Sequence, residues 1–378
     1  FAVRLLLPQN MCIFFAILSG VASGILINFA SEYYVSSAYK PTREFASSLE
    51  MRSSTAIIEG ISSSIVSALW PVLIVGAAVI ISFFACGGNT FDPASFNKGM
   101  YGVAISSLGI LATLGIELST YVFGSIADNA DKIVWAANMD EDVKEKADLL
   151  TSLGNTQSAV GQVFSISSAV FTSIALVAAY ISQINSVAPM MRFNLGITNP
   201  VILTGFFIGA VFPFLFTSLT MRSAAQVTKK MRHIIENQSE GEENITEETL
   251  ETDYETYVDR CAQYSQKLTI LSVVFAVIIP VLVGFIFGIS GVVGFLLGTA
   301  VCGFVFAMLI SNFSRVCVSA KRYMRPHVRK KDCKIFAGDD AVLDWIEGTS
   351  VTSVNILMKL SVAVSIVFVG LVAVMHLI

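Results

Sequence analysis

The sequence has 378 residues, of which 54% are hydrophobic and 14% are charged, and its mean hydropathy is +0.71. Soluble globular domains carry about 25% charged residues, so this composition excludes an ordinary soluble domain and indicates a membrane protein. The formal net charge of −4 at pH 7 and the pI near 5.5 argue against nucleic acid as a partner. The six cysteines lack CxxC spacing, which argues against a zinc site or a disulfide framework.

Eight segments are apolar over about 20 residues or more, the length that a helix needs to cross ~30 Å of hydrocarbon. We therefore predict an all-α polytopic membrane protein that forms a single transmembrane helical domain over residues 1–378. Pro71 lies inside the second segment and predicts a kink there. The predicted spans cover residues 11–30, 55–85, 100–124, 156–185, 198–221, 264–288, 290–311 and 351–378.

The charged residues predict the orientation of these spans. Twenty of the 24 Lys and Arg residues, and 26 of the 28 acidic residues, lie in four loops or at the helix ends beside them. Because loops rich in Lys and Arg stay on the cytoplasmic side, we expect these loops to be cytoplasmic and both ends of the sequence to face the opposite side. The four loops cover residues 31–54, 125–155, 222–263 and 312–350.

The stretch from Tyr121 to Gln162 is the first candidate for a functional site. An apolar helix is expected to run out through Asp128, a charged hairpin follows, and a second helix is expected to begin at Gly154. Carboxylate and amide oxygens at the mouth of two paired helices suit Mg²⁺ and phosphate, because hard cations take oxygen ligands and phosphates need neutralising. We therefore predict a magnesium and phosphate site at this mouth.

Two ionisable residues lie within predicted spans. Glu117 precedes Asp128 by three helical turns, so both are expected on one face of their helix. Lys359 lies about two turns into the last span. Charges at such depth are costly and mark an ion path, a buried pair or a water-filled cavity. The alternatives are that Lys359 reaches the cytoplasmic surface and that Glu117 is a hydrogen-bonded structural acid.

The cytoplasmic loops carry further polar candidates near the ends of their helices. Their carboxylates can meet above the bundle to bind Mg²⁺, with Lys and Arg donating to phosphate. Composition alone favours the plainer interpretation, in which these residues are solvated helix ends and topology signals. No Walker A, dinucleotide-binding, HExxH or GxSxG motif supports another enzyme class. The candidates are Asp128, Asn129, Asp131, Asn155, Lys321, Arg322, Asp339, Asp340, Asp344 and Glu347.

An ordered series of short motifs runs along almost the whole chain. It includes Glu32-Tyr-Tyr-Val-Ser-Ser-Ala-Tyr-Lys40-Pro, Ile126-Ala-Asp128-Asn129-Ala130, Gly154-Asn155-Thr156 and Ser353-Val-Asn355-Ile-Leu-Met-Lys359. Each motif is weak alone, but the ordered set is specific. In this set the chain resembles the C-terminal half of the membrane-integral, ion-pumping inorganic pyrophosphatases.

This resemblance implies a sixteen-helix, usually homodimeric pump that hydrolyses Mg-pyrophosphate at the cytoplasmic ends of its inner helices and couples this to H⁺ or Na⁺ transfer. The eight spans here would be the last eight, and the N-terminal half of the family fold would be absent from the sequence. Carried over residue by residue, the family's metal ligands match Asp128, Asn155, Asp339 and Asp344, its basic pair matches Lys321 and Arg322, and its gate lysine matches Lys359.

Five positions depart from the family pattern. Tyr121 and Val318 stand where the family has acids, and Gln162 replaces a lysine that contacts phosphate. In the last cytoplasmic loop a lysine becomes Glu347 and an aspartate becomes Gly348. Phosphoryl transfer depends on preorganised charge, and the loss of one stabilising group typically costs about 10²–10³ in rate. We therefore expect hydrolysis to be impaired or absent.

Three hypotheses follow. The first is a pyrophosphate-energised pump with an altered site, and the second is a catalytically silent membrane subunit with a structural or partner-binding role. The third, an unrelated secondary transporter that uses Glu117 and Lys359, leaves the motif order unexplained. The expected cofactors are Mg²⁺ and, because Ser158 and Gly161 resemble the potassium-dependent branch, K⁺. The expected partners are the lipid bilayer, a second copy or a larger membrane assembly, and pyrophosphate if the pump is active.

Overall fold

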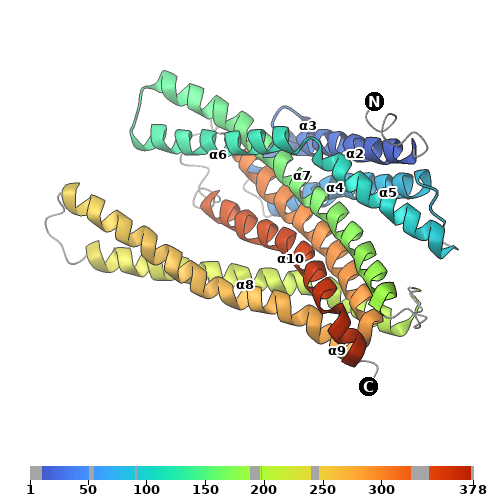
Figure 1. Cartoon of the computed structure of the whole chain (residues 1–378). Helices are drawn as coiled ribbons and strands as arrows, with labels where there is room; N and C mark the ends of the chain where they lie inside the picture. Colours follow the sequence, from blue (N-terminus) through green and yellow to red (C-terminus); the bar gives the residue numbers. More distant parts are fainter. Residues whose placement is uncertain are drawn as a thin grey trace.

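The structure is a computed structural model that describes residues 11–50, 55–89, 92–187, 196, 198–239, 247–324 and 340–375. The described residues are almost entirely helical and contain no strand. Figure 1 shows the helices packed side by side in one elongated bundle. The all-α polytopic fold that the sequence predicts is therefore confirmed.

Within the described residues, the first part of the chain forms five helices, and the long segments that follow form four more. The first five are α2 (Met11–Val35), α3 (Lys40–Glu50), α4 (Thr55–Ala85), α5 (Pro93–Leu111) and α6 (Leu114–Ala136). The other four are α7 (Glu141–Val187), α8 (Pro200–Ser239), α9 (Glu247–Met324) and α10 (Asp340–Met375).

Six of the described helices are long and apolar enough to cross a membrane, and α5 with α6 forms a seventh candidate that is bent by 46°. The 78 residues of α9 would extend about 120 Å as one straight helix, far more than one crossing needs. Gly288 divides α9 into two arms, which run in opposite directions in Figure 1. Its φ of 65° lies in the left-handed region that favours glycine. The described helices therefore supply six or seven candidate spans, and the prediction of eight stays a prediction.

The helices continue well past the predicted spans on the side of the charged loops. α6 ends at Ala136, and α7 already begins at Glu141, so the prediction that this helix begins at Gly154 was wrong. The physical reason is that apolar length marks only the part of a helix that lies in hydrocarbon. Residues 141–150 are rich in Glu, Lys, Ala and Leu, which favour helix in water as well.

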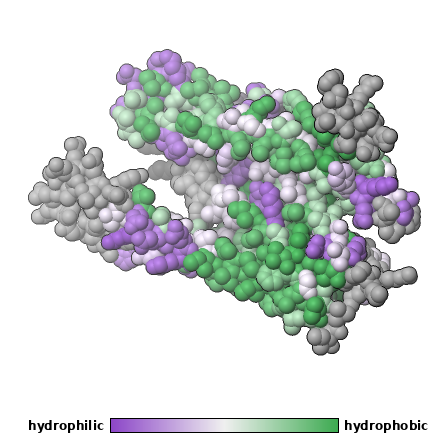
Figure 2. Space-filling view, in the orientation of Figure 1, coloured by the Kyte–Doolittle hydropathy of each residue, from purple (hydrophilic) through white to green (hydrophobic). Residues whose placement is uncertain are grey.

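Large apolar side chains cover the flanks of the bundle. Phe29, Phe84 and Phe207 are each more than 60% exposed. In Figure 2 the hydrophobic surface follows the body of the helices, while hydrophilic residues gather at the tip of the α6–α7 hairpin and on α8 and α9 next to the part drawn in grey. Such an apolar flank is what lipid tails cover in a membrane protein. The chain is therefore an integral, multi-pass membrane protein, and the cytoplasmic placement of its loops stays a prediction.

α7 forms the centre of the bundle. All but two of residues 154–171 are buried, which is typical of a helix surrounded by others. Phe164 and Phe171 belong to one core cluster with Met308 of α9 and Met358 of α10. This packing holds the polar residues near the middle of α7 in a fixed relation to α9 and α10.

Candidate functional site

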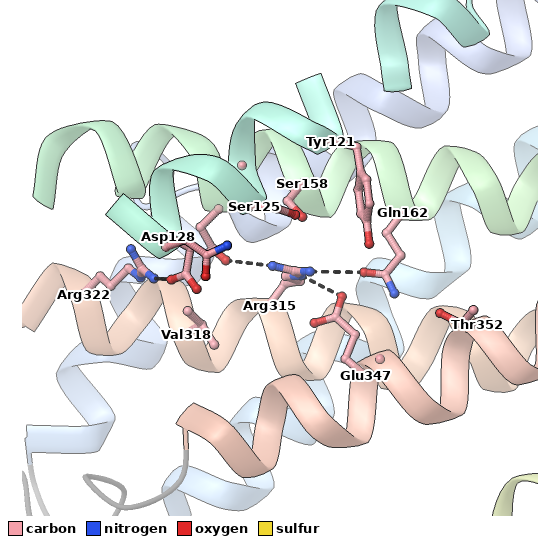
Figure 3. A pocket seen from close by; sticks show the side chains of 14 residues that line it. Tyr121, Ser125, Asp128, Ser158, Gln162, Arg315, Val318, Arg322, Glu347 and Thr352 are labelled. Atoms are coloured by element: carbon pink, nitrogen blue, oxygen red, sulfur yellow. Dashed lines mark hydrogen bonds and ion pairs between the residues drawn. The ribbon is translucent and has the colours of Figure 1, made fainter. Parts of the chain in front are cut away.

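Four helices converge on a pocket of about 300 Å³, which Figure 3 shows from close by. All five positions that depart from the family pattern lie in its wall. The lining residues are Tyr121, Gly124, Ser125, Asp128 and Asn129 of α6, Asn155, Ser158 and Gln162 of α7, Arg315, Val318 and Arg322 of α9, and Glu347, Gly348 and Thr352 of α10.

Helical periodicity explains why these residues share one pocket. On α6, Tyr121, Ser125 and Asp128 follow one another at spacings of four and three residues, which places them on one face. The lining residues of α7 and α9 repeat the same spacings. Each of these three helices therefore presents one face to the pocket.

The close contact of α6 with α7 depends on two glycines. A Cβ atom added to Gly124 would lie 2.3 Å from the carbonyl oxygen of Gly154, so the two backbones meet where neither residue has a side chain. A further link is the Thr151 hydroxyl, which donates to the Ala127 carbonyl at 3.0 Å. This contact brings the two helices of the predicted hairpin to the same pocket.

Arg315 lies at the centre of the pocket and donates to three side chains, as the dashed lines in Figure 3 show. Its Nε donates to Glu347 Oε1 at 2.6 Å, its Nη1 to Asn155 Oδ1 at 3.1 Å, and its Nη2 to Gln162 Oε1 at 3.3 Å. The Asn155 amide nitrogen in turn donates to the Ser319 hydroxyl at 2.8 Å. One guanidinium thus connects α7, α9 and α10.

A second set of ion pairs surrounds Asp128. Arg322 Nη2 donates to its Oδ1 at 2.7 Å, and Lys132 Nζ lies 2.6 Å from its Oδ2. Each carboxylate oxygen of Asp128 therefore already has a cationic partner. Among the described lining residues, the charged side chains are two acids, Asp128 and Glu347, and two arginines, so their charges balance.

The described residues do not fit a magnesium site. Among them, no group of three or more His, Cys, Asp or Glu side chains is arranged to hold a metal ion. Asp128 is paired with two cations, and the Asn155 amide oxygen accepts from the Arg315 guanidinium, which repels a second positive charge.

The structure brings some of the predicted site residues together and separates others. Asp128, Asn155 and Arg322 line the pocket, whereas Lys321 is not among its lining residues. Asp339 lies outside the described residues. Asp344 lies in the first turns of α10, where only the backbone is described.

The two predicted ion-path residues do not line the pocket either. Glu117 is 9% exposed and accepts a hydrogen bond from the Asn28 amide of α2, an arrangement that suits a hydrogen-bonded structural acid. Lys359 is partly buried in α10 and makes no ion pair with another described side chain. Among the described residues, no hydrogen bond or ion pair joins Glu117 to Lys359.

Arg315 is not among the site residues that the sequence predicts. The available signal was its spacing, because Arg315 precedes Val318 by three residues and Arg322 by seven, which places all three on one helical face. A lone Arg at the end of an apolar run was instead counted among the topology signals. Only the approach of α7 and α10 makes it the centre of the pocket.

Comparison with known proteins identifies the family. The family model for inorganic H⁺ pyrophosphatase matches residues 1–368. A protein of Bacteroides thetaiotaomicron, named as a putative K(+)-stimulated pyrophosphate-energized sodium pump, is 33% identical over 94% of this chain and 52% of its own length. A protein of Clostridium tetani with the same name is 34% identical over 95% of this chain and 52% of its own length.

A third relative is named as a proton pump. This K(+)-insensitive pyrophosphate-energized proton pump of Methanosarcina mazei is 30% identical over 94% of this chain and 52% of its own length. The chain spans about half the length of the curated relatives it matches. Because the family model covers nearly every residue, the chain belongs to the inorganic H⁺ pyrophosphatase family.

Proposed function

We propose that this chain forms part of a membrane pyrophosphatase whose pocket has lost most or all capacity to hydrolyse pyrophosphate and, with it, to drive H⁺ or Na⁺ transfer. The observation that carries the proposal is the triple hydrogen bonding of Arg315 to Asn155, Gln162 and Glu347. These contacts fill the pocket with protein groups that bind one another.

The contacts of Arg315 bear directly on substrate binding. A metal ion that binds the Asn155 oxygen would lie close to the Arg315 guanidinium, whose Nη1 is 3.1 Å from that oxygen. Two unit charges at ~4 Å interact by about 4 kcal/mol at an effective dielectric constant of 20, and the repulsion of a divalent ion is larger. A cation at this position therefore meets a strong electrostatic penalty.

The balance of charges points the same way. Pyrophosphate binding needs cations in excess, and Mg²⁺ binding needs carboxylates in excess. Asp128 and Glu347 are each matched by an arginine, so neither excess is present in the described wall of the pocket. Gln162 and Glu347 stand where the family has two lysines, so two cations are missing from this pocket. Catalysis by preorganised charge is weakened accordingly.

A second candidate function is a catalytically silent membrane subunit that acts through its structure or a partner. The observation that favours it is the same network, because a pocket whose charged groups satisfy one another stays folded without a ligand. A homodimer or a larger membrane assembly is the setting that we propose for either function. The two candidates differ in whether any residual turnover depends on Asp128.

Potassium belongs to the proposal as an activator. Two relatives are named as K(+)-stimulated, and Ser158 lies in the pocket wall. Assays in KCl and in choline chloride at equal ionic strength test this point.

The deciding experiment measures Mg²⁺-dependent phosphate release from pyrophosphate by the full-length protein in membrane vesicles. The Bacteroides thetaiotaomicron relative is assayed alongside as a reference. We expect turnover at least about 100-fold below that of the relative. Residual turnover that Asp128→Ala abolishes would identify an impaired pump, and no turnover above background would identify a silent subunit. Turnover within about tenfold of the relative would overturn both candidates.

A further inference from the structure

A second cavity, of about 150 Å³, lies between α8, the first arm of α9 and α10. Of its ten lining residues that the structure describes, seven are Ser or Thr and none is charged. On α10 it is lined by Thr349 and Ser353, which lie one residue beyond Gly348 and Thr352 of the first pocket. Since successive residues turn by about 100°, the two cavities lie on adjacent faces of α10. We propose that this hydroxyl-lined cavity binds an alkali-metal cation.

The hydroxyl groups of the lining residues can bind an occupant as acceptors. Each hydroxyl has one hydrogen to donate and two lone pairs to accept with. Four of the lining hydroxyls already donate to a backbone carbonyl, which leaves their lone pairs for an occupant. These are Thr220 to Thr217 at 2.9 Å, Ser223 to Leu268 at 3.3 Å, Thr269 to Ser265 at 2.8 Å, and Ser353 to Thr349. A hydroxyl whose hydrogen is already donated can only accept, so it attracts a cation and disfavours an anion.

Ser272 provides an independent indication of an occupant. Its side chain is 1% exposed, and its hydroxyl has no hydrogen-bond partner among the described residues. A buried polar group without a partner is costly, and native structures rarely retain one without a ligand, ion or water. An occupant that binds the Ser272 oxygen removes this cost.

The absence of charge in the described cavity wall sets the valence of the ion. A divalent cation needs carboxylates to offset its loss of hydration, and no lining residue supplies one. A monovalent ion is less costly to dehydrate and is satisfied by neutral oxygens. The cavity has room for such an ion with several waters, since a water occupies about 30 Å³ in the liquid.

Binding here is separate from chemistry in the first pocket. The cavity joins the α8–α9 hairpin to α10, so an ion that bridges the three helices stabilises the folded protein by mass action. This inference does not rest on hydrolysis, and a silent subunit would show the same binding.

The test is the thermal unfolding of the full-length protein in nanodiscs at constant ionic strength. Choline chloride is replaced stepwise by NaCl or KCl. We expect a saturable rise in Tm of at least about 1–2 °C with one or both alkali ions. Ser272→Ala and Thr269→Val each remove a cavity oxygen and should abolish most of this rise. In choline, Ser272→Ala should unfold at or above the temperature of the unsubstituted protein, because it deletes an unpartnered buried hydroxyl.

The matched control is Thr228→Val on α8. Thr228 makes the same kind of bond, from its hydroxyl to the Ala224 carbonyl at 3.1 Å, but lies outside the cavity. This variant should keep the full response, and so should Asp128→Asn in the first pocket. The proposal is overturned if neither alkali ion raises Tm, if both cavity variants keep the response, or if Asp128→Asn removes it. Thr269 is exposed and Val has the shape of Thr, so this variant tests the site without disturbing the core.

Discussion

Arg315 and Glu347 form an ion pair of 2.6 Å that joins α9 to α10, with side chains that are 15% and 2% exposed. The pair lies where the resemblance places a lysine, at the centre of the predicted substrate pocket. Its position means that the pocket contributes to the packing of the bundle.

Breaking the pair should destabilise the protein strongly. Glu347→Ala leaves the Arg315 guanidinium in a largely buried site without its carboxylate, and removal of one partner of a buried pair typically costs about 3–5 kcal/mol. The double variant Arg315→Met with Glu347→Leu should cost much less, because neither charge remains buried. The measurement is the free energy of unfolding in mixed micelles.

The control for this prediction is the exposed pair of Lys146 with Asp142. These side chains are 69% and 74% exposed, so Lys146→Ala should cost less than about 1 kcal/mol. If Glu347→Ala costs no more than Lys146→Ala, the buried pair has no structural role.

The effect on stability of reversing the charge at position 347 should depend on Arg315. Glu347→Lys, which restores the residue type of the family, places two cations together and should destabilise the protein more than Glu347→Ala. In an Arg315→Ala background the same lysine should be tolerated, because its repelling neighbour is gone. Thermal unfolding of the parent protein, of Glu347→Lys, of Arg315→Ala and of the double variant gives the coupling between the two positions. Additive effects would contradict the proximity of the two side chains.

The contact of α6 with α7 should not tolerate a side chain at Gly124. Gly124→Ala places a methyl group 2.3 Å from the Gly154 carbonyl oxygen, so the helices must separate, at a cost of about 1–3 kcal/mol. Gly115→Ala on the same helix meets no atom within 4 Å and should change stability little. The two variants are compared by the free energy of unfolding, and equal effects would count against the close contact.

Magnesium should stabilise the unsubstituted protein little. Asp128 and Asn155 are engaged by Lys132, Arg322 and Arg315, so MgCl₂ should shift Tm no more than choline chloride of equal ionic strength. Arg315→Ala frees the Asn155 oxygen and leaves the pocket with an excess of negative charge. This variant should therefore show a larger rise in Tm with Mg²⁺ than the parent protein shows. A saturable Mg²⁺ response in the parent, lost in Asp128→Asn, would show that a metal site survives.

Parts of the site could be predicted because helical spacing is local. The spacing from Tyr121 to Asp128 and the motif order predicted which residues of α6 and α7 share a face, and both stretches line the pocket. The five departures from the family pattern lie in the same wall for the same reason. The placement of Lys321 could not be predicted, because adjacent residues of a helix point about 100° apart and only packing decides which of them faces the pocket.

By itself, the sequence determined the all-α membrane class of the molecule and its family, because apolar length and motif order are properties of consecutive residues. Only the tertiary structure decided what fills the pocket. Arg315 reaches Asn155 and Gln162, more than 150 positions earlier in the chain, and Glu347, 32 positions later. Such contacts depend on how α7, α9 and α10 pack and on which rotamer one side chain adopts between them. Neither property is written in the local pattern of any one helix.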